Sequence, residues 1–350
     1  MYALSAADAI SPAIQRTKIF LFKPFKWGTF LKLCLVAMLT EGFGSNFNSS
    51  WSGHHRSSGS QPRVFSGFHA TPEMVATLAA AVALAIVLCF VVYYLITRLR
   101  FAYFHCLIHN TTLIRPSWHL YRKQATRFFW LNVVVGICFL AVMVLITLPF
   151  LAGLWRIVRD SQAGVHVDIG WALTLILPLI PIIVLFVLAC IAADLILRDL
   201  MLPHYALENA TAGQAWAAVR GRIKREKGPF LLYAILRIVL PIVAGIALFI
   251  VMIIPAIIFI AATVGAEYAI HSVFINAAGA AAVGAIVLEV LVGVIAFGIA
   301  LLVGLCLGGP LSTGIREYAL LFYGGRYQAL GDILAPPPPP DAGLNATATA

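Results

Sequence analysis

Long apolar runs alternate with short, mostly basic segments along this 350-residue chain. A helix needs about 20 predominantly apolar residues to cross roughly 30 Å of hydrocarbon. Six runs have about that length, and they cover residues 25–43, 74–97, 128–152, 171–197, 230–264 and 280–307. The pattern therefore predicts an all-α fold, a polytopic membrane bundle of six transmembrane helices.

Composition excludes a water-soluble globular protein. Hydrophobic residues make up 61% of the chain and charged residues 11%, whereas soluble domains carry about a quarter charged residues. The sequence also lacks the H-E-x-x-H, G-x-x-x-x-G-K-[ST] and G-x-S-x-G motifs of zinc proteases, P-loop ATPases and α/β-hydrolases. We therefore expect no catalytic residues, no metal site and no cofactor, and a non-enzymatic role is favoured.

Basic residues predict the orientation of the chain. Eighteen of the 24 Lys and Arg residues lie in the amino terminus, the second and fourth connections and the carboxyl tail, whereas the opposite side holds four. Because basic residues near span ends are retained in the cytoplasm, both termini are expected there. We predict a multi-pass protein of the inner (cytoplasmic) membrane.

The same local pattern precedes each odd-numbered run: a short basic amphipathic helix, then aromatic residues. Phe25, Phe129 and Phe230 occupy equivalent places, and Arg100, Arg198 and Arg316 lie at or just beyond the ends of the even runs. The recurrence predicts three tandem hairpins, in units of about 5–110, 111–210 and 211–323. Ordinary placement of basic and aromatic residues at span ends is the alternative explanation.

Residues 1–335 are thus predicted to form a single transmembrane domain, with two segments outside the repeat. Residues 44–73 are rich in Ser, Gly and His, which predicts a flexible external loop. Residues 336–350 begin with five prolines and are predicted to be a disordered proline-rich tail.

Three ionisable residues inside the predicted spans are candidates for function, because a charge in a bilayer is costly. Asp194 and Arg237 lie at similar depth and are expected to pair, either as a packing contact or in an ion pathway. Glu289 shares a helix face with a series of small residues that includes Gly304 and Gly308, so it is expected to face protein. It is either a hydrogen-bonded carboxyl or a proton-linked or cation-linked group in a cavity.

Two functions follow from these features. The first is a lipid-interacting scaffold or partner subunit, whose interfacial helices place basic side chains against anionic headgroups. The candidate headgroup-facing residues are Arg220, Arg222, Lys224, Arg225, Lys227, Arg122 and Lys123. The alternative is a small transporter or channel with a polar cavity around Glu289, Asp194 and Arg237. Membrane lipids are the expected partners and nucleic acid is not, while a protein partner or a second copy stays open.

One segment resembles known sequences. Between residues 190 and 240 the order Asp194, Arg198, Pro203, Glu208, Ala215-Trp216, Gly228, Phe230 is similar to uncharacterised bacterial integral membrane families. These include the membrane domain attached to some glycerophosphodiester phosphodiesterases. The resemblance implies a six-helix inner-membrane bundle of unknown activity, and the catalytic phosphodiesterase domain has no counterpart in this chain.

Overall fold

The computed structural model describes residues 4–42, 72–162, 170, 177–274 and 280–335, and within these ranges the chain is helical with no strand. In chain order the elements are α1 (Ile10–Phe22), α2 (Trp27–Ala37), the π-helical turn η1 (Met38–Gly42), α4 (Pro72–Ile108), α5 (Ile114–Leu120), α6 (Arg122–Gln162), α8 (Leu179–Leu195), the π-helical turn η2 (Ile196–Met201), α9 (Leu202–Leu207), α10 (Ala212–Arg225), α11 (Lys227–Phe274), α12 (Ala280–Gly324) and α13 (Gln328–Leu334). The all-α prediction is confirmed for this part of the chain. The predicted loop 44–73, apart from Pro72 and Glu73 at the start of α4, and the predicted tail 336–350 lie outside it.

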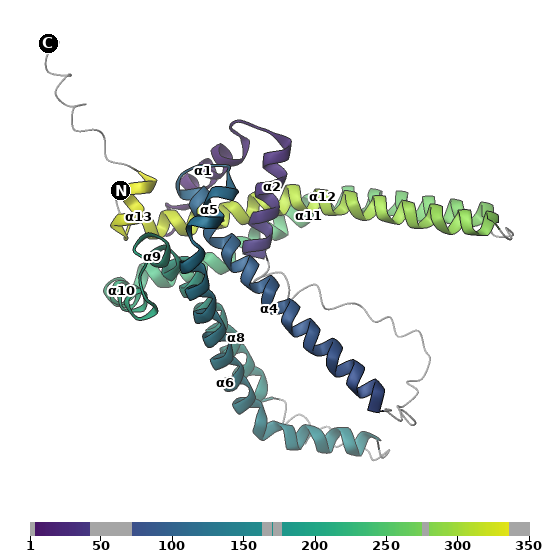
Figure 1. Ribbon diagram of the computed structural model, residues 1–350, viewed down its shortest axis with the longest axis horizontal. Coiled ribbons are helices and arrows are strands. Elements are labelled where there is room, and N and C mark those ends of the chain that lie inside the picture. The colour runs from purple at the N-terminus through teal and green to yellow at the C-terminus, as the bar shows by residue number, and fades with distance from the viewer. Residues whose placement is uncertain (1–3, 43–71, 163–169, 171–176, 275–279, 336–350) are drawn as a thin grey trace, which may run out of the picture.

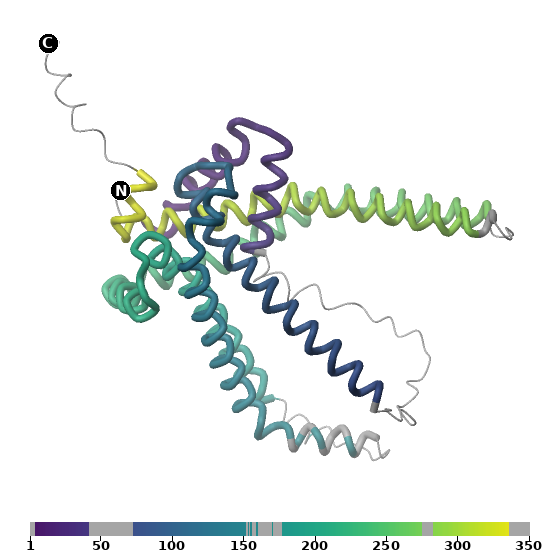
Figure 2. Tube along the Cα trace, viewed as in Figure 1, coloured from purple at the N-terminus to yellow at the C-terminus, as the bar shows by residue number. Residues whose placement is uncertain are grey.

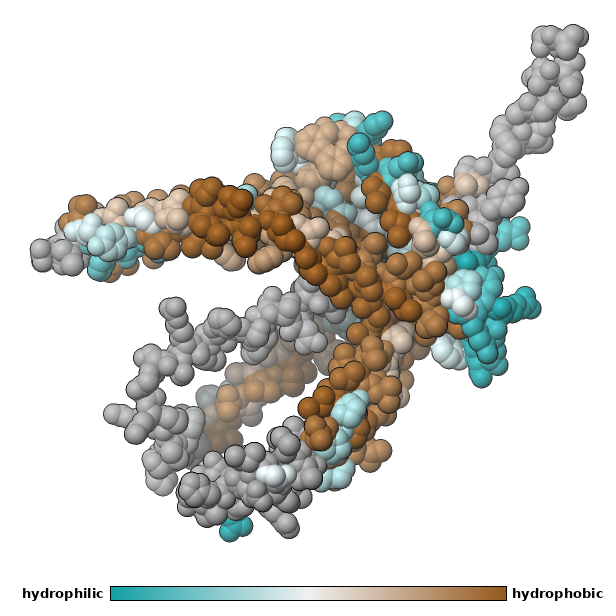
Figure 3. Space-filling view, turned by 180° about the vertical axis from the view of Figure 1, so that it is seen from behind, coloured by the Kyte–Doolittle hydropathy of each residue, from teal (hydrophilic) through white to brown (hydrophobic). Residues whose placement is uncertain are grey.

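Three long arms diverge from one shared base (Figure 1 and Figure 2). The arms are the outer parts of α4, of α6 with α8, and of α11 with α12. The base consists of the short helices and the adjoining ends of the long ones. Figure 3 shows apolar surface along the arms and hydrophilic surface gathered at the base.

Five of the described helices are long and apolar enough to cross a membrane, and these are Glu73–Ile108, Arg122–Leu151, Leu179–Leu207, Lys227–Phe274 and Val283–Gly324. None of their most apolar windows is buried within the protein. An apolar surface of this extent is stable only in hydrocarbon, so the chain is a multi-pass membrane protein.

The first predicted span differs from the others. Residues 25–43 form an 11-residue α2 that continues as the five-residue η1, which is shorter than a bilayer requires. This element packs against α12 in the base, while α4 forms an arm of its own (Figure 1). Six spans in three tandem hairpins therefore stay a prediction. α6 and α8 run side by side, since Phe139 of α6 lies 5.8 Å from Phe186 of α8 between ring centroids.

Aromatic packing holds the base together. Phe128 of α6 contacts Phe101 of α4 and Tyr205 of α9, with ring centroids 5.5 and 5.3 Å apart. Tyr233 of α11 stacks on Phe322 of α12 at 4.3 Å. All five rings are almost fully buried, and the hydroxyl of Tyr233 also contacts the charged site described below. Buried rings of this size supply much of a core's stability.

Both ends of the described chain lie in the base. Arg16 of α1 forms an ion pair with Glu317 of α12 (Nε to Oε2, 3.1 Å). Its Nη atoms also donate to the backbone oxygens of Leu107, at the end of α4, and Leu334, in α13. One arginine thus connects the first helix to the last.

α2 crosses α12 at two consecutive glycines. A Cβ at Gly309 would lie 2.7 Å from the Cα of Cys34, and one at Gly308 would lie 3.0 Å from the Cε of Met38. By contrast, a Cβ at Gly304, one turn earlier in α12, would have no atom within 4 Å. The close approach of the two backbones therefore depends on Gly309.

We predict that Gly309→Ala lowers the free energy of unfolding by about 1–3 kcal/mol, because the backbone of α2 must move away. Gly304→Ala is the matched control and should leave stability unchanged or raise it slightly, since alanine favours a helix. Thermal unfolding of both purified variants in nanodiscs measures the difference. Equal melting temperatures would show that α2 does not depend on this crossing.

Candidate functional site

Charged side chains from five helical elements meet inside the base. We call Glu41, Arg100, Arg198, Asp199, Arg237 and Arg316 the ionic hub. They come from η1, α4, η2, η2, α11 and α12 respectively. Each is at least four-fifths buried, so the hub is a charged cluster enclosed by protein.

Two π-helical turns bring residues into the hub. η1 presents the carboxylate of Glu41 and the backbone oxygen of Thr40 to the hub. η2 contains Arg198 and Asp199, which are neighbours in sequence and are both buried, at 5% and 2% exposure. Short π-helical segments are rare and often occur at functional sites.

Glu41 lies among three arginines from three different elements. Its carboxylate is 3.2 Å from the Nη2 of Arg198 and 3.3 Å from the Nη2 of Arg237. The Nε of Arg316 is 3.7 Å away. Because charge-assisted contacts inside protein are strong and directional, Glu41 ties η1 to η2, α11 and α12.

Asp199 is the second buried acid of the hub. It accepts from the Nη1 of Arg316 at 2.8 Å and from the Nε of Arg237 at 2.9 Å. The hydroxyl of Tyr233 donates to it at 2.8 Å. Both carboxylate oxygens are therefore satisfied by groups from α11 and α12.

The backbone oxygen of Thr40 receives two arginines at once. Arg198 donates to it from Nη2 at 2.7 Å, and Arg100 donates from Nε at 3.0 Å. A terminal carbonyl of η1 thus draws α4 and η2 together. The hub holds the ends of helices from all three predicted repeat units.

A second polar cluster surrounds His204 of α9. Its Nδ1 lies 3.0 Å from Glu208, and its Nε2 lies 2.8 Å from the Tyr323 hydroxyl and 3.1 Å from the Nη1 of Arg222. Because arginine only donates, Nε2 is the acceptor and Nδ1 carries the proton. Partial burial raises the pKa of Glu208, but the His204 hydrogen bond and the Arg222 charge lower it, and the net pKa lies below the usual value. The imidazole is 1% exposed and the Glu208 side chain is 49% exposed, so the imidazole is enclosed by protein and the cluster reaches the surface at Glu208.

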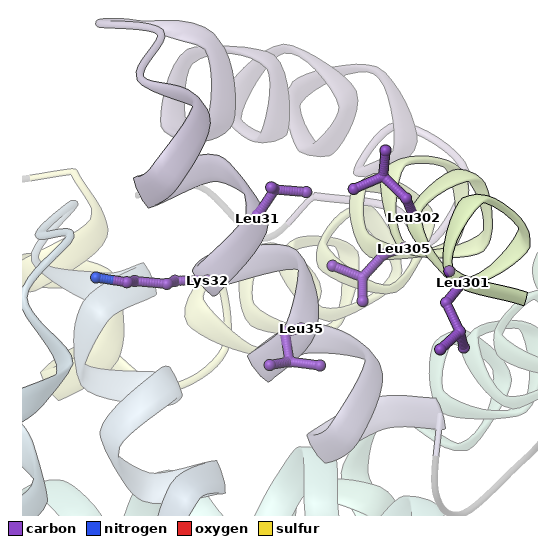
Figure 4. A pocket seen from close by; sticks show the side chains of 7 residues that line it. Leu31, Lys32, Leu35, Leu301, Leu302 and Leu305 are labelled. Atoms are coloured by element: carbon purple, nitrogen blue, oxygen red, sulfur yellow. The ribbon is translucent and has the colours of Figure 1, made fainter. Parts of the chain in front are cut away.

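An apolar groove runs between α2 and α12 (Figure 4). It has a volume of about 330 Å³ and is lined by Leu31, Lys32, Leu35, Gly298, Leu301, Leu302 and Leu305. Figure 4 shows the Lys32 ammonium pointing away from the leucines of α12. The groove therefore offers hydrocarbon-like walls and no polar contact for a hydrophilic substrate. No three metal-binding side chains gather anywhere in the described ranges.

The structure assigns different partners to two of the predicted intramembrane residues. Arg237 pairs with Asp199 and Glu41, whereas Asp194 pairs with Arg198 four residues later at 2.9 Å. The expected pair between Asp194 and Arg237 is thus not formed. The reason is local: η2 turns Asp199 inward, and the Asp194 side chain stays 52% exposed.

Glu289 lies away from these residues. It faces α11, where its carboxylate is 3.6 Å from the Nδ1 of His271. Arg316 of the hub follows 27 positions later on the same helix, which corresponds to about 40 Å at 1.5 Å per residue. Glu289, Asp194 and Arg237 are therefore not brought together.

Six of the seven candidate headgroup-facing residues are exposed: Arg220, Lys224, Arg225, Lys227, Arg122 and Lys123. Arg222 is the exception, because it turns inward onto His204 and lies 5.0 Å from the ring centroid of Tyr327. This helix, α10, begins with a capping box, in which Thr211 N–H donates to the Gln214 side chain at 3.0 Å.

Sequence reasoning missed the roles of Asp199 and Glu41. A usable signal was present, however. Arg100, Arg198 and Arg316 occupy equivalent positions after the even runs, and the structure gathers all three in the hub. Three equivalent cations at one depth indicate that acids must lie nearby.

Comparison with known proteins identifies the family to which the chain belongs. The model of a family of unknown function (DUF7544) matches residues 4–333, which is nearly the whole chain. No curated protein and no solved structure matches the chain.

We predict that Asp199→Asn destabilises the protein by about 3–5 kcal/mol, because Arg237 and Arg316 would stay buried without their shared countercharge. Asp194→Asn is the control: its side chain is half exposed and Arg198 keeps Glu41, so the loss should stay below about 1 kcal/mol. Thermal unfolding in nanodiscs compares them. Similar losses for both variants would contradict a central role for Asp199.

Proposed function

We propose that this chain, which belongs to the DUF7544 family of unknown function, is a non-enzymatic, lipid-interacting scaffold or partner subunit of the inner membrane. The observation that carries the proposal is the division between a charged, protein-packed base and arms whose apolar windows have no protein cover. Such a molecule uses its base to fix helix ends and its arms to contact lipid. A protein partner or a second copy would add to this lipid contact.

The length of the arms supports a base at the membrane surface. α12 has 45 residues, which is roughly 68 Å of helix, whereas about 30 Å crosses the hydrocarbon. Its apolar run ends near residue 307, and the hub residue Arg316 follows. We therefore place the hub at or just beyond the headgroups, on the cytoplasmic side.

The exposed basic residues support contact with anionic lipid. Lys224 and Arg225 end α10, and Lys227 begins α11 immediately before the aromatic residues of the next arm. Arg122 and Lys123 begin α6 in the same way. Basic side chains at this level are attracted to anionic headgroups by about 1 kcal/mol each.

A topology of six crossings fits these features. α1 and α13 both lie in the base, so the termini belong on one side of the membrane. The five spanning helices alone would give an odd number of crossings, and α4 starts at its end remote from the base (Figure 1). We propose that the chain makes one further crossing between α1 and α4, which gives six crossings with both termini in the cytoplasm.

Reporter fusions at either terminus test this topology. We expect a fusion partner that is active only in the cytoplasm to be active at both ends, because the basic connectors are retained there. Fusions in the 44–73 segment should be inactive. Activity at one terminus only would overturn the six-crossing topology.

The lipid role predicts a charge-dependent response to lipid. Phosphatidylglycerol should raise the melting temperature of the detergent-solubilised protein more than phosphatidylcholine does. In the double variant Lys224→Gln/Arg225→Gln this difference should shrink, by an amount equivalent to about 2 kcal/mol of lipid attraction.

Arg222→Gln is the matched control on the same helix, because Arg222 faces His204. It should lower stability in both lipids and leave the difference between them intact. An equal response of the wild type to the two lipids would remove the lipid role.

A further inference from the structure

The hub holds more positive than negative charge. Arg100, Arg198, Arg237 and Arg316 face two enclosed carboxylates, Glu41 and Asp199, and the half-exposed Asp194 is the remaining acid that pairs with a hub arginine in the described residues. Even with Asp194 included, four cations stand against three anions. Enclosed charge without an opposite charge is costly, so the surplus requires an anion.

Arg100 is the arginine without a carboxylate. Within the described ranges its single side-chain hydrogen bond is the one from Nε to the Thr40 oxygen at 3.0 Å, and no ion pair involves it. Both Nη groups are therefore unused, although the residue is 7% exposed. Beside it, Arg198 reaches the same Thr40 oxygen, and its Nε is buried without a partner in the described part of the chain.

A neighbouring arginine shows that this is not a general property of the helix end. Arg98, two positions earlier, donates to the Trp118 backbone oxygen at 3.2 and 3.0 Å and lies 4.6 Å from the centroid of the Trp118 ring. The guanidinium of Arg98 thus has protein partners. The Nη groups of Arg100 have none among the described residues.

The position of Arg100 identifies the class of anion. The apolar run of α4 ends at Thr97, so Arg100 follows by about 4.5 Å of helix, the level at which phospholipid phosphates lie. A guanidinium presents a planar set of N–H donors that matches two phosphate oxygens. Three to four turns earlier on the same side of α4, Phe90 and Ile86 are 49% and 52% exposed, and these apolar side chains suit an acyl chain.

We propose that Arg100, with Arg198 beside it, binds the phosphate of an anionic phospholipid at the foot of the α4 arm. This inference rests on the proposed lipid role and names its site. The bound phosphate supplies the negative charge that the hub lacks. The lipid is then a bound component of the structure and not only part of the surrounding bilayer.

Native mass spectrometry of the full-length protein, released from detergent with added phosphatidylglycerol, tests the site. Wild type should retain one lipid after the others have been stripped, and Arg100→Gln should lose it, with about tenfold weaker retention. The melting temperature of Arg100→Gln without lipid should equal or exceed that of wild type, because an uncompensated charge is removed. Arg100→Lys should retain the lipid to an intermediate degree.

Arg98→Gln provides the structural control. It should lower the melting temperature without lipid and leave retention unchanged. If Arg100→Gln behaves like Arg98→Gln, Arg100 is a structural residue and the site is overturned. Loss of the phosphatidylglycerol response in Lys224→Gln/Arg225→Gln but not in Arg100→Gln would overturn this site while leaving the proposed lipid role intact.

The source of the phosphate is tested separately. Inorganic phosphate at millimolar concentration should not stabilise the lipid-free wild type. If it does so for wild type and not for Arg100→Gln, the site takes a soluble anion, and the lipid assignment is overturned.

Discussion

The burial of two carboxylates among four arginines is the constraint on which the arrangement of the helices depends. Glu41 and Asp199 contact arginines of η2, α11 and α12, so none of these three elements can move away without leaving a buried charge unpaired. Buried ion pairs rarely add much net stability compared with apolar packing. Here their effect is to specify which helix ends meet. The surrounding aromatic rings supply the packing that makes the meeting stable.

The base and the arms are therefore stabilised in two different environments. In the base, polar groups find partners within the protein and apolar rings pack on one another, as in a soluble domain. In the arms, the backbone is satisfied inside each helix while no side chain of the most apolar windows is buried, which is the solution that hydrocarbon demands. The boundary between the two regimes falls where the apolar runs end and the hub arginines begin.

Much of the fold could be predicted from the sequence, because a membrane span requires a long uncharged run and such runs are easily seen. The run at 25–43 resembles the others in composition, but its helix is short and packs on α12, a contact permitted by Gly309 that no hydropathy pattern shows. The recurrence of Arg100, Arg198 and Arg316 served to predict a repeat, and these three residues meet in the hub.

Partners within the site could not be predicted in the same way. Asp194 and Asp199 are both acids close to the end of one apolar run, and the choice between them depends on a π-helical turn that leaves no periodic signature. Asp199 also follows a basic residue in a connection, where charges are expected to be hydrated. Arg222 shows the same limit, since its orientation depends on contacts with His204 and Tyr327 from distant elements.

Fixing the arms at one end has a mechanical consequence. Each arm is long compared with the hub, and the hub contacts hold it at one end only. A rotation at the hub arginines therefore turns the whole arm about that end. A slight rotation of one helix end would be magnified into a large sideways excursion of the far tip. A change in bilayer thickness or lateral pressure that displaces those tips would in turn displace the charged side chains of the hub.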